Sequence, residues 1–188
     1  MTLFETVGKQ NTAAAAAIAV AKAKELNCSI VLSSNSGCSA EVVLEQAQKQ
    51  DYHGKIVVVR NATSVARNNG VNMMAPEMKQ SLLERGCAVV GAANALSAGE
   101  RGLSTRLHGV YPLEIMAYTL RMFGQGTKVC VECAIMAMDA DELVFAAPVV
   151  ALGGTGGGLD TAMVITPSYS SSILDTKIHE ILCKPSLK

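Results

Sequence analysis

Short apolar segments recur along this chain, and their lengths and flanking residues predict strands of a buried sheet. Residues 29–32 form a short apolar run, and residues 55–59 are β-branched on both faces of the pleat, which is typical of parallel strands. Ala88–Val90 and Pro148–Leu152 are predicted as further strands. Two further strands are predicted over 161–166 and 177–183, the latter at an edge.

Segments with helical signals separate these strands. We predict helices over Thr12–Leu26, Ala40–Lys49, Pro76–Gly86, Pro112–Phe123 and Thr127–Ala140. Prolines open two of them, and glycines end or break two. The segments 61–75 and 92–111 are predicted as long connections. The strand–helix alternation predicts one α/β domain over residues 1–188, a three-layer α/β/α sandwich with a mostly parallel sheet.

The composition supports a folded domain and argues against one class of partner. Of the 188 residues, 49% are hydrophobic and 17% are charged, the opposite balance from a disordered chain. Sixteen Lys and Arg balance sixteen Asp and Glu, so no field of one sign attracts a polyanion. Aromatic residues are 4% of the chain and Trp is absent. We therefore expect no nucleic-acid partner.

The longest apolar run, Ala13–Ala21, is too short to span a bilayer. It is also a poor signal peptide, because Glu5 lies where basic residues belong and Asn11-Thr12 is typical of a helix cap. We therefore expect a soluble, cytoplasmic protein with no membrane partner. Its six cysteines are then expected to be reduced thiols that pack as small apolar groups.

A polar loop, 33–39, follows the first predicted buried strand and leads into a helix. The start of that helix offers unpaired N–H groups, the serines offer hydroxyls, and Gly37 lets the backbone approach a ligand. These features favour a cradle for a phosphate monoester. The alternative is a capped helix that follows a polar turn. The candidate binding residues here are Ser34, Asn35, Ser36, Gly37, Ser39 and Ala40.

A glycine-rich loop, 153–158, also follows a strand and is expected at the same edge of the sheet. It matches neither a dinucleotide fingerprint nor a Walker A loop. A flexible hairpin connection is the alternative interpretation. Its candidate binding residues are Gly154, Thr155 and Gly156. Arg101 and Arg106, from the predicted connection 92–111, are candidate ligand-binding residues at the same edge of the sheet, and the alternative is that they are solvated surface arginines. Together the loops predict a site for a phosphorylated small molecule.

The remaining polar and sulfur-containing motifs are weaker. Cys130 and Cys133 form a CxxC inside an apolar pattern, so core packing is favoured over zinc or redox chemistry. Between them, Glu132 either faces water or meets a cation or a ligand hydroxyl. The three histidines show no metal-ligand spacing, and only His108 neighbours the arginines. No metal site is expected.

The segment Ser36-Gly37-Cys38-Ser39-Ala40 resembles the Ser-Gly-x-Ser-Ala loop of the pyruvate kinase C-terminal domain. The chain is more similar still to the small stand-alone proteins that are related to this domain, the pyruvate kinase C-terminal-domain-like family of archaea and bacteria. The similarity covers nearly the whole chain and is densest after Ala92. The segments that carry it include Gly8–Thr12, Ala95–Arg106, Gly109–Ala117, Gly126–Glu132, Ala134–Ala137, Gly153–Thr155 and Asp160–Ala162.

The resemblance implies an α/β/α sandwich and a pocket that accepts flavin mononucleotide (FMN) in some members, with no known reaction. It places the phosphate on the 34–40 loop, with the loop from Gly154 and the two arginines bordering the rest. In one place the chain departs from the family, because Val59–Val65 lacks a stretch with aromatic and histidine character. That departure leaves the phosphate site intact and puts the flavin ring site in doubt.

Three hypotheses follow. The first is a protein that binds a phosphorylated small molecule, with FMN as the leading candidate. The second is an enzyme that uses the same pocket, with Glu132, His108 and the arginines as candidate groups. The third is a regulatory or assembly module, a homo-oligomer whose helices 12–26 and 127–140 pack between subunits. Pyruvate kinase activity is not expected, because the catalytic barrel is missing.

Overall fold

The computed structural model describes residues 1–62 and 72–186, and its seven strands form one mixed sheet in the order β1-β7-β6-β5-β2-β3-β4. β6 runs antiparallel to both of its neighbours, whereas every other pairing is parallel. The mostly parallel sheet predicted from the sequence is therefore confirmed. The strands are β1 Thr2–Phe4, β2 Ile30–Ser33, β3 Ile56–Asn61, β4 Ala88–Ala92, β5 Val149–Gly153, β6 Thr161–Thr166 and β7 Lys177–Pro185.

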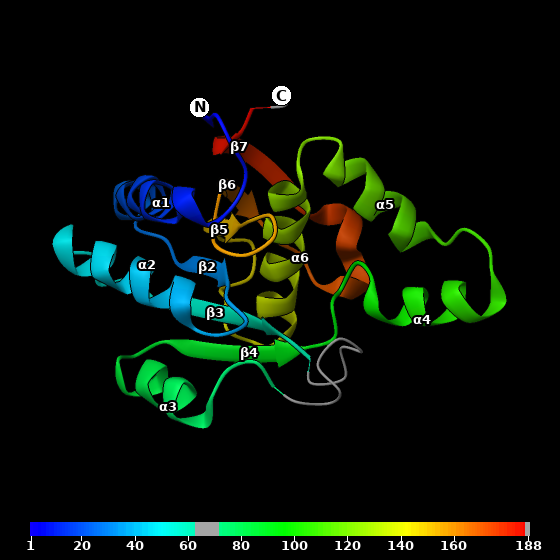
Figure 1. Cartoon of the computed structure of the whole chain (residues 1–188), viewed down its shortest axis with the longest axis horizontal. Coiled ribbons are helices and arrows are strands. Elements are labelled where there is room, and N and C mark those ends of the chain that lie inside the picture. The colour runs from blue at the N-terminus through cyan, green and yellow to red at the C-terminus, as the bar shows by residue number, and fades with distance from the viewer. Residues whose placement is uncertain (63–71, 187–188) are drawn as a thin grey trace.

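Helices flank both faces of the sheet (Figure 1). α1, α2 and α3 contribute to the hydrophobic core on one face, and α5 and α6 contribute to the core on the other. The helices are α1 Thr12–Leu26, α2 Cys38–Lys49, α3 Pro76–Glu84, α4 Ala98–Leu107, α5 Pro112–Arg121 and α6 Gln125–Asp139. The five predicted helices are thus confirmed, the first with the predicted bounds and the others with ends that shift by at most two residues.

Successive residues of the central strands enter opposite cores. Ile30 and Leu32 of β2 pack under α1 and α2, whereas Val31 between them packs under α6. Strands buried in this way on both faces need apolar residues at every position. This is why the central strands are continuous apolar runs in the sequence.

The path of the chain creates a crevice beside β2. From β2 the chain passes through α2 to β3 and through α3 to β4, toward one edge of the sheet. It then returns through α4, α5 and α6 to β5, on the other side of β2. The loops after β2 and β5 therefore lead away from each other at the carboxyl ends of adjacent parallel strands. In open α/β sheets, ligands bind at this kind of topological switch point.

Two sequence predictions about local structure are wrong. Residues 98–107 form helix α4 and not a loop, although the segment holds Gly99 and Gly102. The helix buries none of its own residues, but its Ser104 hydroxyl donates to Glu114 Oε1 (2.8 Å), and Glu100 Oε2 accepts from the Glu114 N–H (3.1 Å). These bonds to α5 stabilise α4 without an apolar face.

The second wrong prediction concerns the sheet edge. Residues 2–4 form β1, which pairs in parallel with β7 and places that strand inside the sheet. A three-residue strand carries too little pattern to be seen in the sequence. The connection predicted over residues 61–75 falls largely outside the described residues.

Helix α6 is buried by its own chain. Twelve of its residues, from Gly126 to Met138, are buried, and its apolar side chains belong to the core beneath the sheet. The hypothesis that this helix packs between subunits is therefore wrong. Among the described helices, none is both long and apolar enough to cross a bilayer.

Candidate functional site

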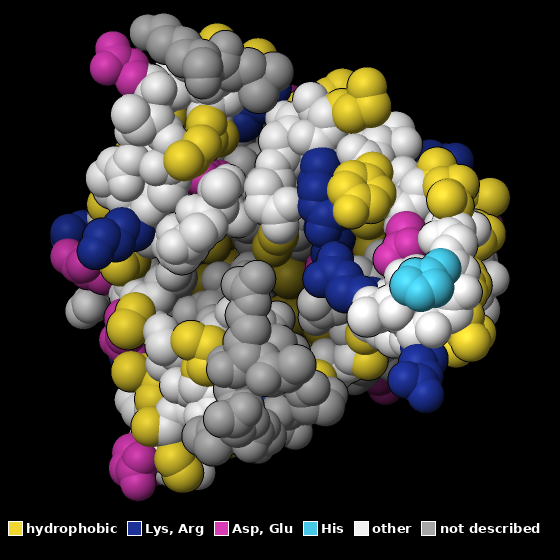
Figure 2. Space-filling view, turned by 45° about the vertical axis from the view of Figure 1, so that its right-hand side comes forward, with side chains coloured by type: hydrophobic (Ala, Val, Ile, Leu, Met, Phe, Trp, Pro, Cys, Tyr) yellow, Lys and Arg dark blue, Asp and Glu magenta, His cyan; other side chains and the backbone are white. Residues whose placement is uncertain are grey.

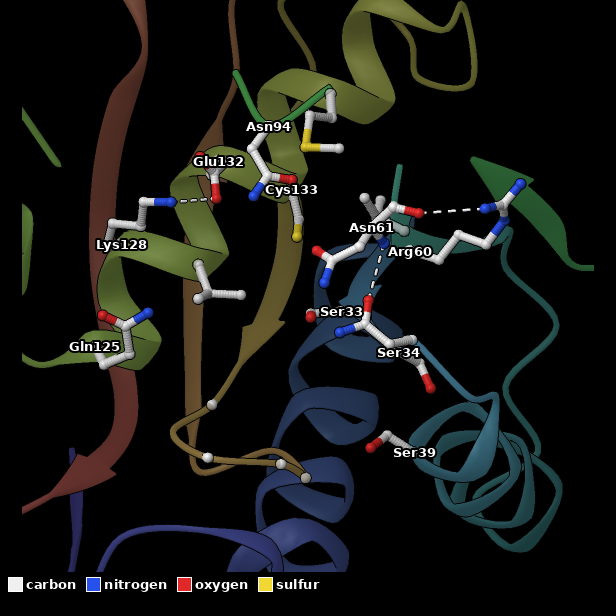
Figure 3. Close-up of a pocket in the computed structure, with 18 of the residues that line it drawn as sticks. Ser33, Ser34, Ser39, Arg60, Asn61, Asn94, Gln125, Lys128, Glu132 and Cys133 are labelled. Carbon is white, nitrogen blue, oxygen red and sulfur yellow. Dashed lines mark hydrogen bonds and ion pairs between the residues drawn. The ribbon is translucent and has the colours of Figure 1, made fainter. Parts of the chain in front are cut away.

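A pocket of about 540 Å³ lies at the carboxyl ends of β2, β3 and β5, at the switch point (Figure 3). Both loops singled out in the sequence border it, one through Ser34, Ser36 and Ser39 and the other through the glycines that follow β5. Helix α6 forms the opposite side, where Gln125, Lys128 and Glu132 lie (Figure 3). A volume of this size suits a small metabolite or a nucleotide and not a bare ion.

The loop after β2 is held by the neighbouring strand. The Ser34 N–H donates to the Val59 carbonyl (2.9 Å), and Asn35 Oδ1 accepts from the Asn61 N–H (2.8 Å). The Oδ1 atom of Asn35 is therefore used within the protein, although Asn35 also lines the pocket. In contrast, Ser34 lines the pocket and is only 4% exposed, and its hydroxyl has no partner among the described residues. A buried hydroxyl without a partner is destabilising, and a ligand acceptor would satisfy it.

Helix α2 begins beside Ser34, and the Ser36 hydroxyl accepts from the Cys38 N–H at its start (3.4 Å). Its N-cap is Gly37, which has no side-chain acceptor to offer. The N–H groups of Ser39 and Ala40 in the first turn and the positive end of the helix dipole are thus available for an anion.

The structure explains the glycine at position 37 differently from the sequence prediction, which had it let the backbone approach a ligand. Its φ is +95°, and an added Cβ would lie 2.3 Å from the Met78 Cγ on α3. The glycine makes room for a methionine and for a left-handed turn, and it does not line the pocket.

The glycine-rich loop is shaped from behind by a buried carboxylate. Asp160 is fully buried, and its Oδ2 accepts from the Thr155 N–H (3.2 Å) and from the Gly8 N–H (3.0 Å). The Thr155 amide therefore binds Asp160 and is not available to a ligand. The positive φ values of Gly156 and Gly157 belong to a turn in which a Cβ would meet open space, and these two glycines face the pocket.

The structure separates the two arginines that the sequence paired. Arg101 on α4 lines the pocket, whereas Arg106 is exposed and lies outside it. Because α4 is a helix, five residues carry the second arginine round to another side. The prediction that a loop brings both to the pocket is wrong. Of the other candidates, Gly154 lines the pocket, and Ala40 and Thr155 do not.

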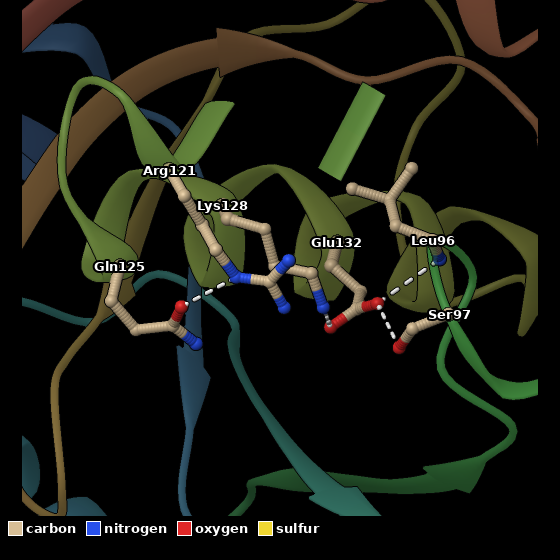
Figure 4. A network of polar contacts seen from close by, with 6 residues as sticks. All are labelled: Leu96, Ser97, Arg121, Gln125, Lys128 and Glu132. Carbon is tan, nitrogen blue, oxygen red and sulfur yellow. Dashed lines mark hydrogen bonds and ion pairs between the residues drawn. The ribbon is translucent and has the colours of Figure 1, made fainter. Parts of the chain in front are cut away.

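A buried ion pair forms the wall opposite the serines (Figure 4). Lys128 pairs with Glu132 one helical turn later on α6, and their side chains are 4% and 5% exposed. Glu132 Oε1 also accepts from the Leu96 N–H (3.0 Å) and from the Ser97 hydroxyl (3.2 Å). This answers the question left open by the sequence, because Glu132 meets a cation.

Burial disfavours the charged ammonium of Lys128 and lowers its pKa, while the negative charge of Glu132 acts in the opposite direction. The nearby Arg121 adds a smaller lowering effect. Arg121 and Lys128 were not among the sequence-predicted site residues. The signal available for Lys128 was a lysine within an otherwise buried helical pattern, four residues before Glu132.

The CxxC cysteines are packing residues. Cys130 and Cys133 are buried in the core beneath α6, and desolvation raises the pKa of the Cys133 thiol to about 12 and also raises the pKa of the Cys130 thiol well above its ordinary value. Such thiols stay protonated and unreactive at neutral pH. Across residues 1–62 and 72–186, no group of three or more His, Cys, Asp or Glu side chains could hold a metal ion. His108 is exposed at the end of α4 and is not part of the pocket.

The fold and the pocket together define an α/β protein with a pocket at the switch point of its mostly parallel sheet. No protein-family model matches the chain. Residues 63–65, which include part of the departure from the pyruvate kinase C-terminal-domain-like pattern, lie outside the described residues.

Proposed function

We propose that this protein binds a phosphorylated small molecule in the pocket beside β2, with the phosphate on the loop that leads into α2. One observation carries the proposal: Ser34 lines the pocket beside the start of α2, and its buried hydroxyl has no described partner. A phosphate oxygen would satisfy the hydroxyl and the helix N–H groups together.

The resemblance to the pyruvate kinase C-terminal-domain-like family makes FMN the leading candidate. The helices on both faces of a mostly parallel sheet agree with the three-layer sandwich of that family. The phosphate end of FMN suits the serine loop. The ring would meet Val59, Val129 and Met136, since no aromatic side chain is among the described residues of the pocket wall. A bound flavin would supply electron-transfer chemistry, and this chain would supply the site.

Calorimetry with FMN, with riboflavin and with a simple alkyl phosphate tests the proposal. We expect FMN and the alkyl phosphate to bind and riboflavin, which lacks the phosphate, to bind much more weakly. Ser34→Ala should weaken phosphate binding by about tenfold or more, as for the loss of a hydrogen bond to a charged group. Ser171→Ala, at an exposed position, is the matched control. If no phosphate monoester binds, the proposal is wrong.

A second candidate is an enzyme that uses this pocket, and one observation favours it. Lys128 and Glu132 are a buried titratable pair in the pocket wall, and such pairs are frequent at catalytic sites. His108, the other acid–base candidate from the sequence, is outside the pocket. NMR of phosphorylated metabolites incubated with the protein should then show turnover that Glu132→Gln abolishes.

A regulatory or assembly role is the third candidate, and the expected homo-oligomer stays a prediction. Helix α6 cannot provide the contact, because it lies in the core of its own chain. Light scattering at several protein concentrations would decide between a monomer and an oligomer.

A further inference from the structure

Cationic side chains gather on one wall of the pocket and not around the serines. Arg101, Arg121 and Lys128, the cationic wall, come from α4, α5 and α6. Figure 2 shows Lys and Arg side chains along one side of a hollow in this face, and Figure 3 shows Lys128 across the pocket from Ser34 and Ser39. Arg60 also borders the pocket, but its guanidinium turns away and donates to the Asn61 carbonyl.

The acidic side chains of the pocket do not balance this wall. Glu132 is the one carboxylate among the described lining residues, and Lys128 already pairs with it. No Asp or Glu in the described part of the chain forms an ion pair with Arg101 or Arg121. The overall charge of the protein is zero, so the excess of positive charge is local to this pocket.

Arg121 is held in place by its neighbours. Its Nε donates to Gln125 Oε1 (2.8 Å), and its guanidinium carbon lies 5.1 Å from the centre of the Tyr118 ring. Figure 4 shows the guanidinium beside the ammonium of Lys128. A guanidinium fixed in this way, with its terminal nitrogens unpaired by any described carboxylate, is preorganised to bind a planar anion such as a carboxylate or a phosphate.

A bound anion would also stabilise the neighbouring positive charges of Arg121 and Lys128. The positive charge of Arg121 contributes to the lowered pKa of Lys128, so the two groups repel each other. Glu132 compensates only one of them, since its second oxygen accepts from the Leu96 N–H and the Ser97 hydroxyl. A negatively charged ligand group at Arg121 would remove the repulsion.

We infer that the ligand carries a second acidic group, a carboxylate or a phosphate, at the end opposite its phosphate monoester, and that Arg121 binds this group beside Lys128. The inference rests on the proposed function and narrows its ligand class to small molecules with two anionic ends. A pocket of about 540 Å³ has room for both ends and a short connecting chain. FMN carries no carboxylate or phosphate on its ring, so it would bind through its phosphate end alone and leave Arg121 unpaired, and ligands with two anionic ends should bind more tightly than FMN.

Three matched series of test ligands decide the matter by calorimetry: n-alkyl phosphates, ω-carboxyalkyl phosphates and α,ω-alkane bisphosphates of the same chain lengths. At one chain length we expect a second acidic end to increase affinity by about tenfold or more, as for a charge-assisted bidentate contact. Arg121→Gln should abolish this gain while leaving the affinity for the plain alkyl phosphate unchanged. Arg106→Gln removes the same charge from an exposed site outside the pocket and should keep the gain.

Each negative result of these binding experiments has a different meaning. If alkyl phosphates bind and a second acid adds nothing at any length, the inference is wrong and the proposed function stands. If Arg121→Gln weakens the alkyl phosphate as much as the doubly acidic ligands, Arg121 holds the monoester itself, and the inference is again wrong. If no phosphate binds at all, the proposed function fails and the inference fails with it. The melting temperature of each variant shows that it is folded.

Discussion

At the scale of single residues, Lys128 and Glu132 are the most unusual positions of this protein. Charged groups this deeply buried destabilise a fold unless they are paired. The pair here is completed by hydrogen bonds from Leu96 and Ser97, which connect the start of α4 to α6. The same carboxylate therefore neutralises a lysine and fixes the segment that carries Arg101 to the pocket.

Removing one member of this pair should be more damaging than removing both charges. We expect Lys128→Met to destabilise the protein by about 3–5 kcal/mol, because it leaves Glu132 buried and unpaired. Adding Glu132→Gln should recover most of that loss, since an amide oxygen can still accept from the Leu96 N–H. Urea unfolding of the wild type, both single variants and the double variant measures the coupling. Additive effects would show that the pair is not coupled.

The same pair predicts how stability depends on pH. Burial lowers the pKa of Lys128 below 10.5 in the folded protein, so the unfolded chain binds more protons between the lowered pKa and 10.5. The free energy of unfolding should therefore rise with pH across this window, and the gain is lost as pH falls through the folded pKa. Relative to the double variant, the wild type should become more stable between neutral pH and pH 10.5. A constant difference would contradict the lowered pKa.

Thiol labelling tests the assignment of the CxxC. Desolvation raises the pKa of Cys133 to about 12, whereas Cys38 is exposed at the start of α2. With iodoacetamide and the native protein, mass spectrometry should find Cys38 modified first and Cys130 and Cys133 modified only after unfolding. Labelling of Cys133 as fast as that of Cys38 would show that solvent reaches it through the pocket.

At the scale of elements, glycines in helices have opposite roles in this protein. Gly102 of α4 is exposed, and an added Cβ would meet nothing within 4 Å. Gly126 of α6 is buried, and there an added Cβ would lie 2.0 Å from Thr161 Oγ1. Gly102 therefore weakens α4 although a side chain would fit there, whereas Gly126 allows α6 to approach β6.

A pair of alanine substitutions should therefore change stability in opposite directions. We expect Gly102→Ala to stabilise the protein by about 0.5–1 kcal/mol, through the lower backbone entropy of the unfolded chain. We expect Gly126→Ala to destabilise it by about 1–3 kcal/mol through overpacking. Chemical denaturation measures both. A destabilising Gly102→Ala would indicate that α4 packs against something that the described contacts do not include.

At the scale of the whole molecule, Asp160 joins parts of the chain that lie 152 residues apart. Its carboxylate binds Gly8 before α1, Thr155 in the glycine-rich loop and, through Oδ1, the Thr161 hydroxyl (2.9 Å). Thr12, at the start of α1, adds a second link, because its hydroxyl accepts from the Leu159 N–H (3.0 Å). One side of the pocket thus depends on the N-terminal segment.

We expect Asp160→Asn to destabilise the protein by about 1.5–3 kcal/mol, because bonds to a charged acceptor are lost in a fully buried site. Hydrogen exchange should become faster at Gly8 and in the glycine-rich loop before it changes in α6. Asp139→Asn is the control, since its carboxylate also accepts from a backbone N–H, that of Ser170, but at an exposed site. Equal effects of the two substitutions would rule out a special role for the buried network.

The sequence by itself determined most of the elements of this protein and two sides of its pocket. Continuous apolar runs and proline or glycine boundaries are local signals, so the central strands, five helices and the loops at 33–39 and 153–158 could be predicted. The tertiary structure decided what depends on distant partners. It made α4 a helix through Glu100, Ser104 and Glu114, and it completed the sheet with β1. It also brought Lys128 and Arg121 to the pocket and turned Arg106 away, because the positions of long charged side chains are set by packing between elements that no local pattern records.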